Sequence, residues 1–536
     1  MLVAYSRVYN LGCLLATLRY PFYNGYVRIW VIAVCIFVFA LSLRLWNLHD
    51  GGRWSDEQAF LEKGYRLNEL IKQKDFSHPY WYTDGADHPP VAYYLYGLAS
   101  YKDFIKFDTT AVSSNSKLFT GAPVFAYDMP NSRMLSILLS SLTVMLVFFI
   151  GLRYVSLFTG IASSIMLALL PHFLGYSQFV DLENLILFFF TAAAFSFIRF
   201  LETKKDKFLI LTGILTGISV GIKESNVLLS PFYFGGFFIW KTINKKPIPS
   251  FAHLFFIGFI ACITFIALWP MPFFHLHEYS NFVYNLWIKN NGLVPELLFG
   301  KTMGARFFYY PVAFFVTTPV LIILLTGIGI TISIMQRKQW FYPILIWWFI
   351  VPFFMMFFHH RQHMMRYIIE VYIPLSLLAG IGLEFCARRI IKNSIIVYCA
   401  IIPISIYLFF ILLNMTPYYL SYYNELVGGT KQVYEKKLFY LGWFGEGLKG
   451  PGEYVAKHAA KNARIGLALN LDSGFYKIPT IHYETFNSNH SYDFVIVSYF
   501  NVVRLGFDEK ILEKEYTLVY REKADGADLA RVYKHK

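Results

Sequence analysis

The chain has 536 residues, of which 56% are hydrophobic and only 15% are charged, and its mean hydropathy is +0.45. This composition excludes an ordinary water-soluble globular protein and predicts a helical membrane protein. The formal net charge of +14 belongs mostly to short connections between apolar segments. Because no basic stripe interleaved with aromatic residues occurs in a polar region, nucleic acid is not an expected partner.

Apolar segments of roughly 17–25 residues, the length that crosses about 30 Å of hydrocarbon, recur along the first three quarters of the chain. They predict about eleven membrane spans, at residues 29–45, 133–152, 155–171, 183–200, 208–222, 226–240, 251–270, 309–335, 341–358, 367–386 and 394–413. A shorter apolar stretch at 91–105 is interrupted by Lys102 and Asp103, which favours an interfacial helix.

The basic residues predict the orientation of these spans. With the N-terminus in the cytoplasm, every cytoplasmic connection carries Lys or Arg, as the positive-inside rule requires. An odd number of spans then places the loop 46–132 and the tail 414–536 together on the non-cytoplasmic face. The predicted units are a transmembrane domain at 1–413 and a separate extracytoplasmic domain at 414–536, in the plasma (inner) membrane if the source is prokaryotic.

The tail changes composition to polar residues with Gly and Lys, and its periodicity changes too. It predicts a small α/β or α+β module with a helix at 453–460, strands at 463–469 and 492–499, and a closing hairpin of strands 516–520 and 529–533. The five cysteines all fall in or beside membrane segments, so disulfides and cysteine-zinc sites are not expected.

Two adjacent acids, Asp56 and Glu57, follow the first span after Gly51-Gly52. A carboxylate at the membrane face can take a proton from an acceptor hydroxyl or amine, and a second can orient the first or hold a cation. A structural role is equally open, in which Asp56 caps a helix at 57–72 and Glu57 stabilises its dipole.

Further candidate residues lie in the same and the next external connections. In Asp87-His88-Pro89-Pro90 the prolines fix the backbone and aim His88, although this turn can also simply begin the next helix. Asp181 and Glu183 precede a very apolar helix, where they could act as simple caps, the reading favoured for Glu183. They are also candidates for supporting substrate, and Glu57 and Asp181 for holding a metal ion.

The expected outer face also carries cations. Lys223 lies between two apolar segments, where a lysine is costly unless it reaches the interface or meets an anion. Arg361 and Arg366 occur where the positive-inside rule expects few basic residues, and the arginine fork suits a lipid phosphate. His359 and His363 have a spacing that would suit a metal on a helix, but a wet interfacial loop is favoured there.

These motifs, in this order, resemble the polyprenyl-phosphate-dependent glycosyltransferases of the C-type membrane fold, the group of the protein O-mannosyltransferases and the lipid A aminoarabinose transferase. The resemblance extends over residues 40–450. It is carried by Asp56-Glu57, Asp87-His88-Pro89-Pro90, Tyr309-Tyr310-Pro311 with Thr318-Pro319, Met365-Arg366-Tyr367 with Pro374, and two segments after the last span, at 417–429 and 441–447.

The resemblance implies transfer of a sugar, with inversion, from a polyprenyl-phosphate donor to a protein, glycan or lipid acceptor. It implies that Asp56 is the base, with Glu57, Asp87 and His88 as further catalytic residues, and that Lys223, Arg361 and Arg366 bind the donor phosphate. No cofactor is certain, and a divalent cation is one possibility because metal use varies in the family.

Two other classes of membrane protein are alternatives to a glycosyltransferase. A transporter would place charges near the bilayer midplane in broken, repeated helices, whereas here the acids lie at span ends and no repeat is evident. A flippase or O-antigen-type polymerase also uses outward arginines, but the Asp-Glu and His-Pro-Pro loops argue against both.

Overall fold

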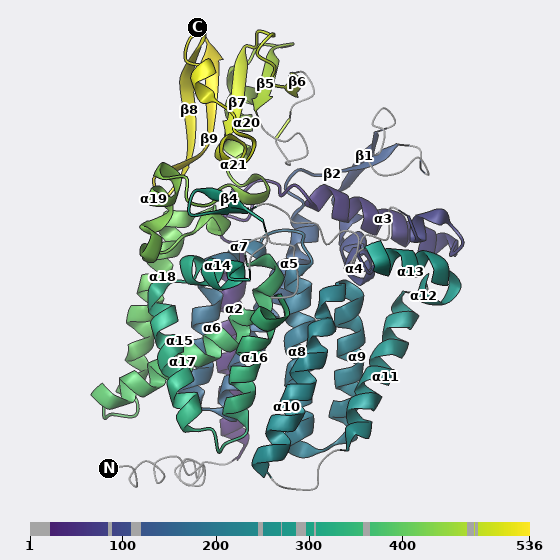
Figure 1. The fold of residues 1–536 in the computed structure, drawn as a ribbon, viewed down its shortest axis with the longest axis vertical. Coiled ribbons are helices and arrows are strands. Elements are labelled where there is room, and N and C mark those ends of the chain that lie inside the picture. The colour runs from purple at the N-terminus through teal and green to yellow at the C-terminus, as the bar shows by residue number, and fades with distance from the viewer. Residues whose placement is uncertain are drawn as a thin grey trace.

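A computed structural model describes residues 22–536 except 84–87, 109–118, 120, 245–249, 270, 286–295, 305–306, 357–364, 469–475 and 478–480. A bundle of long helices occupies most of the molecule, and a smaller unit with a β-sheet stands on one end of it (Figure 1). Side chains of the bundle are largely hydrophobic inside and outside, as expected for helices that face lipid.

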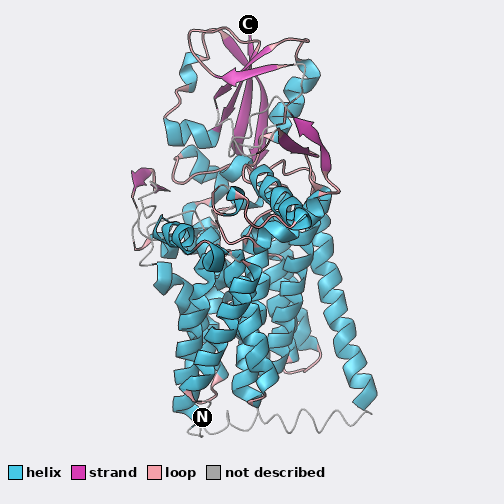
Figure 2. Cartoon of the chain, turned by 90° about the vertical axis from the view of Figure 1, so that its right-hand side faces the viewer, coloured by secondary structure: helices cyan, strands magenta, loops and turns pink. Residues whose placement is uncertain are grey.

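The long helices lie side by side and run along the same axis (Figures 1 and 2). They are α2 (Phe22–Leu45), α5 (Pro130–Tyr154), α6 (Leu157–Ala168), α8 (Glu183–Thr203), α9 (Asp206–Ile222), α10 (Leu229–Asn244), α11 (Phe251–Leu268), α15 (Val320–Met335), α16 (Phe341–Met356), α17 (Tyr372–Ile390) and α18 (Ile401–Met415). Shorter elements beside them are α7 (Pro171–Tyr176), α12 (Met271–Phe274), α13 (Leu276–Tyr284), α14 (Tyr309–Thr317), and the 3₁₀ helices η2 (Glu224–Leu228), η4 (Arg366–Val371) and η5 (Ile396–Ala400).

Among the described residues, six helices are long and apolar enough to cross a membrane, and a bent pair adds a seventh if it counts as one span. The chain is therefore an integral, multi-pass membrane protein. All eleven predicted apolar segments coincide with helices, but several of these are too short to qualify by themselves. The segment at 309–335 is two helices, α14 and α15, which meet at 116° because Pro319 cannot continue the first of them.

The first loop lies across one end of the bundle as α3 (Glu57–Gln73), α4 (Val91–Ser100) and a hairpin of β1 (Phe104–Asp108) and β2 (Ala122–Phe125) (Figure 1). Two glycines bring the helices together, since a Cβ added to Gly64 would lie 2.3 Å from the Tyr93 carbonyl oxygen and one added to Gly97 would lie 2.2 Å from the Gly64 oxygen. The predicted interfacial helix is thus α4, and its close packing fixes the start of α3.

The C-terminal unit contains a mixed sheet with strand order β6-β5-β7-β9-β8, in which β5 pairs in parallel with β6 and β7 and the other neighbours are antiparallel. Its elements are α19 (Gly429–Glu435), α20 (Lys449–His458), β5 (Arg464–Ala468), β6 (His482–Thr485), β7 (Phe494–Ser498), α21 (Tyr499–Leu505), β8 (Tyr516–Ala524) and β9 (Ala527–His535). The sequence had not predicted β6, an edge strand whose residues are half-buried or exposed.

The first loop and the tail meet at the same end of the bundle. The Ser55 amide donates to the Phe444 carbonyl oxygen at 2.9 Å. The Lys449 ammonium donates to the His49 carbonyl oxygen at 2.5 Å and lies 3.5 Å from a carboxylate oxygen of Asp128. The predicted proximity of these two segments is therefore present in the fold.

Candidate active site

Asp56 lies at the start of α3, and its side chain is 39% exposed. It occupies the N-cap position, yet its carboxylate makes no capping hydrogen bond to α3. Instead Oδ2 lies 3.3 Å from Nη1 of Arg366, and Oδ1 lies 3.4 Å from the Ser55 hydroxyl. A capping role therefore does not describe Asp56.

Arg366, the first residue of η4, connects Asp56 to the helix bundle. Its Nε donates to Oε1 of Glu183 at 2.7 Å while Nη1 reaches Asp56. The guanidinium carbon lies 5.1 Å from the ring centroid of Trp54 and 5.2 Å from that of Phe444. Two carboxylates and two aromatic rings, all from other segments of the chain, thus fix the arginine.

Glu183 and Lys223 continue this arrangement inward. Glu183 is fully buried at the start of α8, and its Oε1 accepts from both Arg366 and the Lys223 ammonium, the latter at 3.1 Å. Lys223 follows the last residue of α9 and lies over the Tyr367 ring at 4.6 Å. A simple cap therefore does not describe Glu183, which joins the two cations expected to face an anion.

Asp56, Arg366, Glu183 and Lys223 form a row of alternating charge, which we call the charge row. It starts at the half-exposed Asp56 and ends at the buried Lys223. Its two acids and two bases cancel, so the row as a whole carries no net charge, and each buried charge has an oppositely charged neighbour. The four residues come from four distant parts of the sequence, and the fold brings all of them together.

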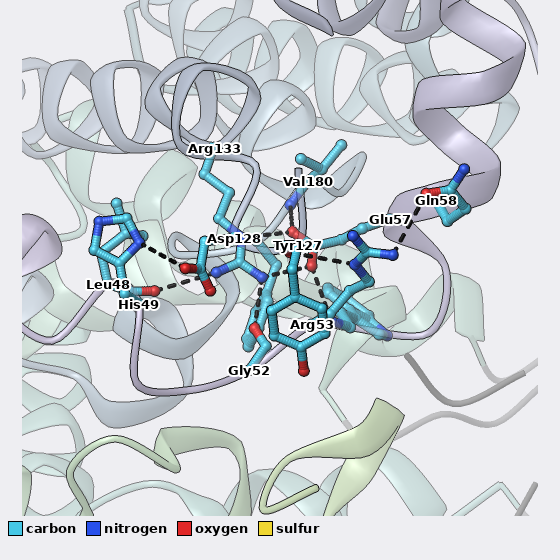
Figure 3. A network of polar contacts seen from close by, with 12 residues as sticks. Leu48, His49, Gly52, Arg53, Glu57, Gln58, Tyr127, Asp128, Arg133 and Val180 are labelled. Carbon is cyan, nitrogen blue, oxygen red and sulfur yellow. Dashed lines mark hydrogen bonds and ion pairs between the residues drawn. The ribbon is translucent and has the colours of Figure 1, made fainter. Parts of the chain in front are cut away.

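Glu57, adjacent to Asp56, has different surroundings (Figure 3). Its side chain is completely buried against Arg133 of α5, with Nη2 to Oε2 at 2.6 Å and Nε to Oε1 at 2.8 Å. The amides of Trp54 and Val180 donate to the same two oxygens at 2.8 Å each. Both oxygens of Glu57 thus accept hydrogen bonds from the surrounding protein. This supports a role in which Glu57 fixes the start of α3 and so orients Asp56.

Asp181 is buried beside the charge row but is not part of it. Its Oδ1 accepts from the backbone amide and side-chain amide of Asn184, and its Oδ2 has no hydrogen-bond partner among the described residues. Burial, with the nearby charge of Glu183, raises the pKa of Asp181 well above its usual value. The protonated form of this carboxyl group is therefore favoured relative to that of an exposed aspartate.

His88 forms a second polar contact at the same end of the bundle. Its Nδ1 lies 3.1 Å from Oε2 of Glu224, the first residue of η2 and the neighbour of Lys223. Burial alone would raise the pKa of Glu224, but the charge and hydrogen bond of His88 outweigh it and lower the pKa. Of the other predicted site residues, Asp87 and Arg361 lie outside the described residues.

Several site residues had no role in the sequence analysis. Arg133 lies within an apolar segment, where a charged residue is costly, so the sequence alone could have indicated that it has a role. Phe444 lies in the segment 441–447 that carries part of the resemblance, but nothing in the sequence indicates what Trp54, Glu224 and Phe444 touch.

The described residues contain no group of three or more His, Cys, Asp or Glu side chains placed to hold a metal ion. Glu57 does not fit the predicted ligand role, because Arg133 and two backbone amides use both of its oxygens. Oδ2 of Asp181 and Oε2 of Glu183 have no hydrogen-bond partner among the described residues, but two carboxylate oxygens do not by themselves make a cation site.

Among solved structures, the chain is similar to ArnT from Cupriavidus metallidurans in the apo state, at 12% identity, a TM-score of 0.48 and coverage of 95% of this chain and 98% of that one. The apo oligosaccharyltransferase of Archaeoglobus fulgidus matches at 12% identity and a TM-score of 0.46, covering 83% of this chain and 63% of that one. The S. cerevisiae protein O-mannosyltransferase Pmt1-Pmt2 complex bound to the sugar donor matches at 21% identity and a TM-score of 0.32, covering 51% and 38%. No curated protein matches the sequence significantly.

Residues 82–283 match the family model of dolichyl-phosphate-mannose-protein mannosyltransferases. That stretch includes His88, Asp181, Glu183 and Lys223, whereas Asp56 and Arg366 lie outside it. The match does not favour a transporter or a polymerase. The chain is a membrane glycosyltransferase, and the match over residues 82–283 confirms the predicted relationship to the polyprenyl-phosphate-dependent enzymes.

Proposed function

We propose that this enzyme transfers a sugar from a polyprenyl-phosphate donor to a hydroxyl group of a protein, glycan or lipid acceptor, and that the charge row is its catalytic centre. The observation that carries the proposal is the position of Arg366 between Asp56 and Glu183, at the end of the bundle where the first loop and the tail meet. A lipid donor keeps its chain in the bilayer and its phosphate at this level.

Asp56 is the proposed base because it is the only carboxylate of the charge row that is half-exposed. It removes the proton of the acceptor hydroxyl while the oxygen attacks the anomeric carbon. The bond from that carbon to the phosphate oxygen breaks, its electron pair leaves with polyprenyl phosphate, and attack from the opposite side inverts the configuration. Glu57 holds Asp56 in place through the start of α3.

Arg366 and Lys223 are the proposed phosphate ligands, and Arg361, which lies outside the described residues, is proposed as a third. In the described arrangement Glu183 neutralises part of their charge and orients both. A donor phosphate would exchange for the contact between Arg366 and Asp56, which leaves the carboxylate free to accept a proton. Charge-assisted hydrogen bonds from the two cations then offset the negative charge that develops on the departing phosphate.

His88 is a further proposed catalytic residue, oriented by Glu224, and Asp87 stays a candidate beside it. Asp181 is proposed to support the substrate as a neutral carboxyl group, in keeping with its raised pKa. A divalent cation stays a proposal that the geometry supports only weakly, since Glu57 has no free oxygen. Activity after treatment with EDTA and dialysis tests it.

The finer topology is also a proposal. Eleven spans, a cytoplasmic N-terminus and a non-cytoplasmic catalytic face agree with the basic connections and with the eleven apolar segments. We propose a transmembrane domain at 1–413, an extracytoplasmic domain at 414–536, and residence in the plasma (inner) membrane if the source is prokaryotic.

The direct experiment uses the purified full chain in proteoliposomes with polyprenyl phosphate that carries a radiolabelled hexose. Time-dependent appearance of the label in a water-soluble or protein product, with release of polyprenyl phosphate, supports the proposal. Movement of intact donor across the bilayer without cleavage would instead identify a flippase, and a lengthened lipid-linked chain would identify a polymerase.

A further inference from the structure

The tail contributes one tight turn to the charge row, at residues 442–447. We propose that Phe444, at the tip of this turn, is a positioning residue that holds Arg366 in the orientation needed to bind the donor phosphate. The inference rests on the proposed function, and it assigns a catalytic purpose to the contact between the C-terminal unit and the membrane domain.

Phe444 touches the site through both its ring and its backbone. The ring centroid lies 4.4 Å from that of Trp54, and the Arg366 guanidinium carbon lies 5.2 Å from it. The Phe444 carbonyl oxygen accepts from the Ser55 amide at 2.9 Å, next to Asp56. One residue therefore contacts the proposed phosphate ligand and the residue that precedes the proposed base.

The backbone at Phe444 is strained. Its φ of 57° lies in the left-handed region, where a bulky side chain is an outlier. Gly442, Gly445 and Gly447 of the same turn also have positive φ, so left-handed conformations recur through it. Glycine would be less strained at this position, so the presence of phenylalanine indicates that its ring has a role. The ring contacts the guanidinium of Arg366.

The buried side chain of Glu446, which is 4% exposed, anchors the turn through hydrogen bonds. Its Oε1 accepts from the Leu420 amide at 3.0 Å and its Oε2 from the Ser421 hydroxyl at 2.8 Å. The Ser421 hydroxyl in turn accepts from the Gly442 amide at 3.0 Å. These bonds tie both ends of the turn to the segment that follows the last span.

The other side of the turn faces the sheet of the C-terminal unit. A Cβ added at Gly447, where φ is 82°, would lie 2.7 Å from Cβ of Leu529 in β9. The turn is thus wedged between β9 and the charge row. The position of the sheet therefore sets the position of the Phe444 ring.

The physical effect is orientation. Trp54 and Phe444 restrict the guanidinium by ring contacts, while Glu183 and Asp56 bind two of its nitrogens. Loss of one ring lets the long arginine side chain sample other rotamers, and the entropy that must then be lost on binding weakens phosphate affinity. The acceptor does not meet this ring in the proposal, so its KM is not expected to change.

The test compares Phe444→Leu, Phe444→Gly and Phe444→Tyr with Phe500→Leu as the matched control. Phe500 packs on Trp443, whose ring centroid lies 5.4 Å away, in the same aromatic cluster but away from Arg366. Each full-length variant is measured for binding of radiolabelled polyprenyl phosphate, for the KM of donor and of acceptor, and for its melting temperature.

We expect about a tenfold loss of polyprenyl-phosphate affinity and a similar rise in donor KM for Phe444→Leu and Phe444→Gly. Phe444→Tyr and Phe500→Leu should bind as the wild type does. Phe444→Gly is decisive because it removes the strain, so its fold should be retained while the ring is lost.

Phe444→Gly with wild-type donor binding would overturn the inference, as would a loss that falls equally on donor and acceptor. If the wild-type protein neither binds polyprenyl phosphate nor transfers sugar, the proposed function itself is wrong. That outcome is separate from a defect confined to the Phe444 variants.

Discussion

Arg133 and Glu57 form an ion pair in which both side chains are completely buried, with Nη2 of the arginine 2.6 Å from Oε2 of the glutamate. Two backbone amides complete the set of donors to the carboxylate. The pair fastens α5 to the beginning of α3. The two adjacent acids therefore have different roles: Glu57 is buried against Arg133, whereas Asp56 is half-exposed beside Arg366.

This division predicts that Glu57→Ala destabilises the protein. Removal of the carboxylate leaves the Arg133 charge buried without a partner, which typically costs about 3–5 kcal/mol. A thermal-stability measurement on the detergent-solubilised protein should show a large fall in the melting temperature.

The matched control is the double variant Glu57→Met, Arg133→Met, which removes both charges and should recover part of that loss. A Glu57→Ala protein that melts like the wild type but has lost its activity would instead make Glu57 a catalytic residue.

Arg366 and Lys223 provide a prediction on donor binding. Arg366→Gln and Lys223→Met each remove one charge-assisted hydrogen bond to the phosphate, worth about 1.5–3 kcal/mol, so affinity for polyprenyl phosphate should fall about 10- to 150-fold. Equilibrium binding of the radiolabelled lipid checks this.

Arg153→Gln serves as the control for those variants. Arg153 pairs with Glu202 near the far end of α5 and is half-exposed, so its loss should leave lipid binding unchanged. Equal losses in all three variants would point to a general effect of positive charge and contradict a specific phosphate site.

Glu446 predicts a dependence of stability on pH. Burial raises the pKa of its carboxyl group to about 8, although bonds from Ser421 and Leu420 act in the opposite direction. In the unfolded chain the group releases its proton near its ordinary pKa of about 4.3. Between these values the folded state holds the extra proton, so stability should fall as pH rises, by at most about 1.4 kcal/mol per unit, and level off above about pH 8.

Glu446→Gln lacks this titration and checks the prediction. Melting temperatures of the wild type and of this variant should differ most near pH 8 and converge near pH 4. A constant difference over that range would show that Glu446 does not keep its proton in the folded protein.

The proposed topology can be tested with single cysteines in a cysteine-free background. Ser77→Cys follows α3 in the first loop, Ser488→Cys lies between β6 and β7 in the tail, and Ser250→Cys comes just before α11, and all three positions are exposed. A membrane-impermeant maleimide applied to intact cells should label the first two and spare the third. Labelling of Ser250→Cys alone would reverse the orientation.

Much of the bundle was predictable from the sequence, because a long apolar run in a membrane has little alternative to a helix. The break at Pro319 followed less clearly, since a proline in an apolar run can either kink a helix or end it. β6 escaped prediction because its four residues carry no alternating apolar pattern. Pairing with β5 stabilises this strand, and a single sequence does not reveal that pairing.

The sequence predicted which residues belong to the site better than it predicted the contacts between them. Asp56, Lys223 and Arg366 stood out because charge beside an apolar span is costly, and the fold joins all three. The different roles of Asp56 and Glu57 did not follow from their adjacency. Successive residues of a helix point about 100° apart, so one side chain can be buried while its neighbour is open. The part played by Phe444 depends on a contact between residues far apart in the chain.

The assignment of Asp56 as the base is central to the proposed mechanism. Asp56→Asn keeps the size of the side chain and should reduce turnover of polyprenyl-phosphate sugar by at least about a hundredfold, while expression, melting temperature and lipid binding stay near normal. Asp75→Asn, just beyond the other end of α3, is the matched control and should turn over normally. The decisive measurement is single-turnover sugar transfer by these two variants in proteoliposomes. A slow Asp56→Asn beside a normal Asp75→Asn is the predicted result, and normal transfer by Asp56→Asn would contradict the assignment of the base.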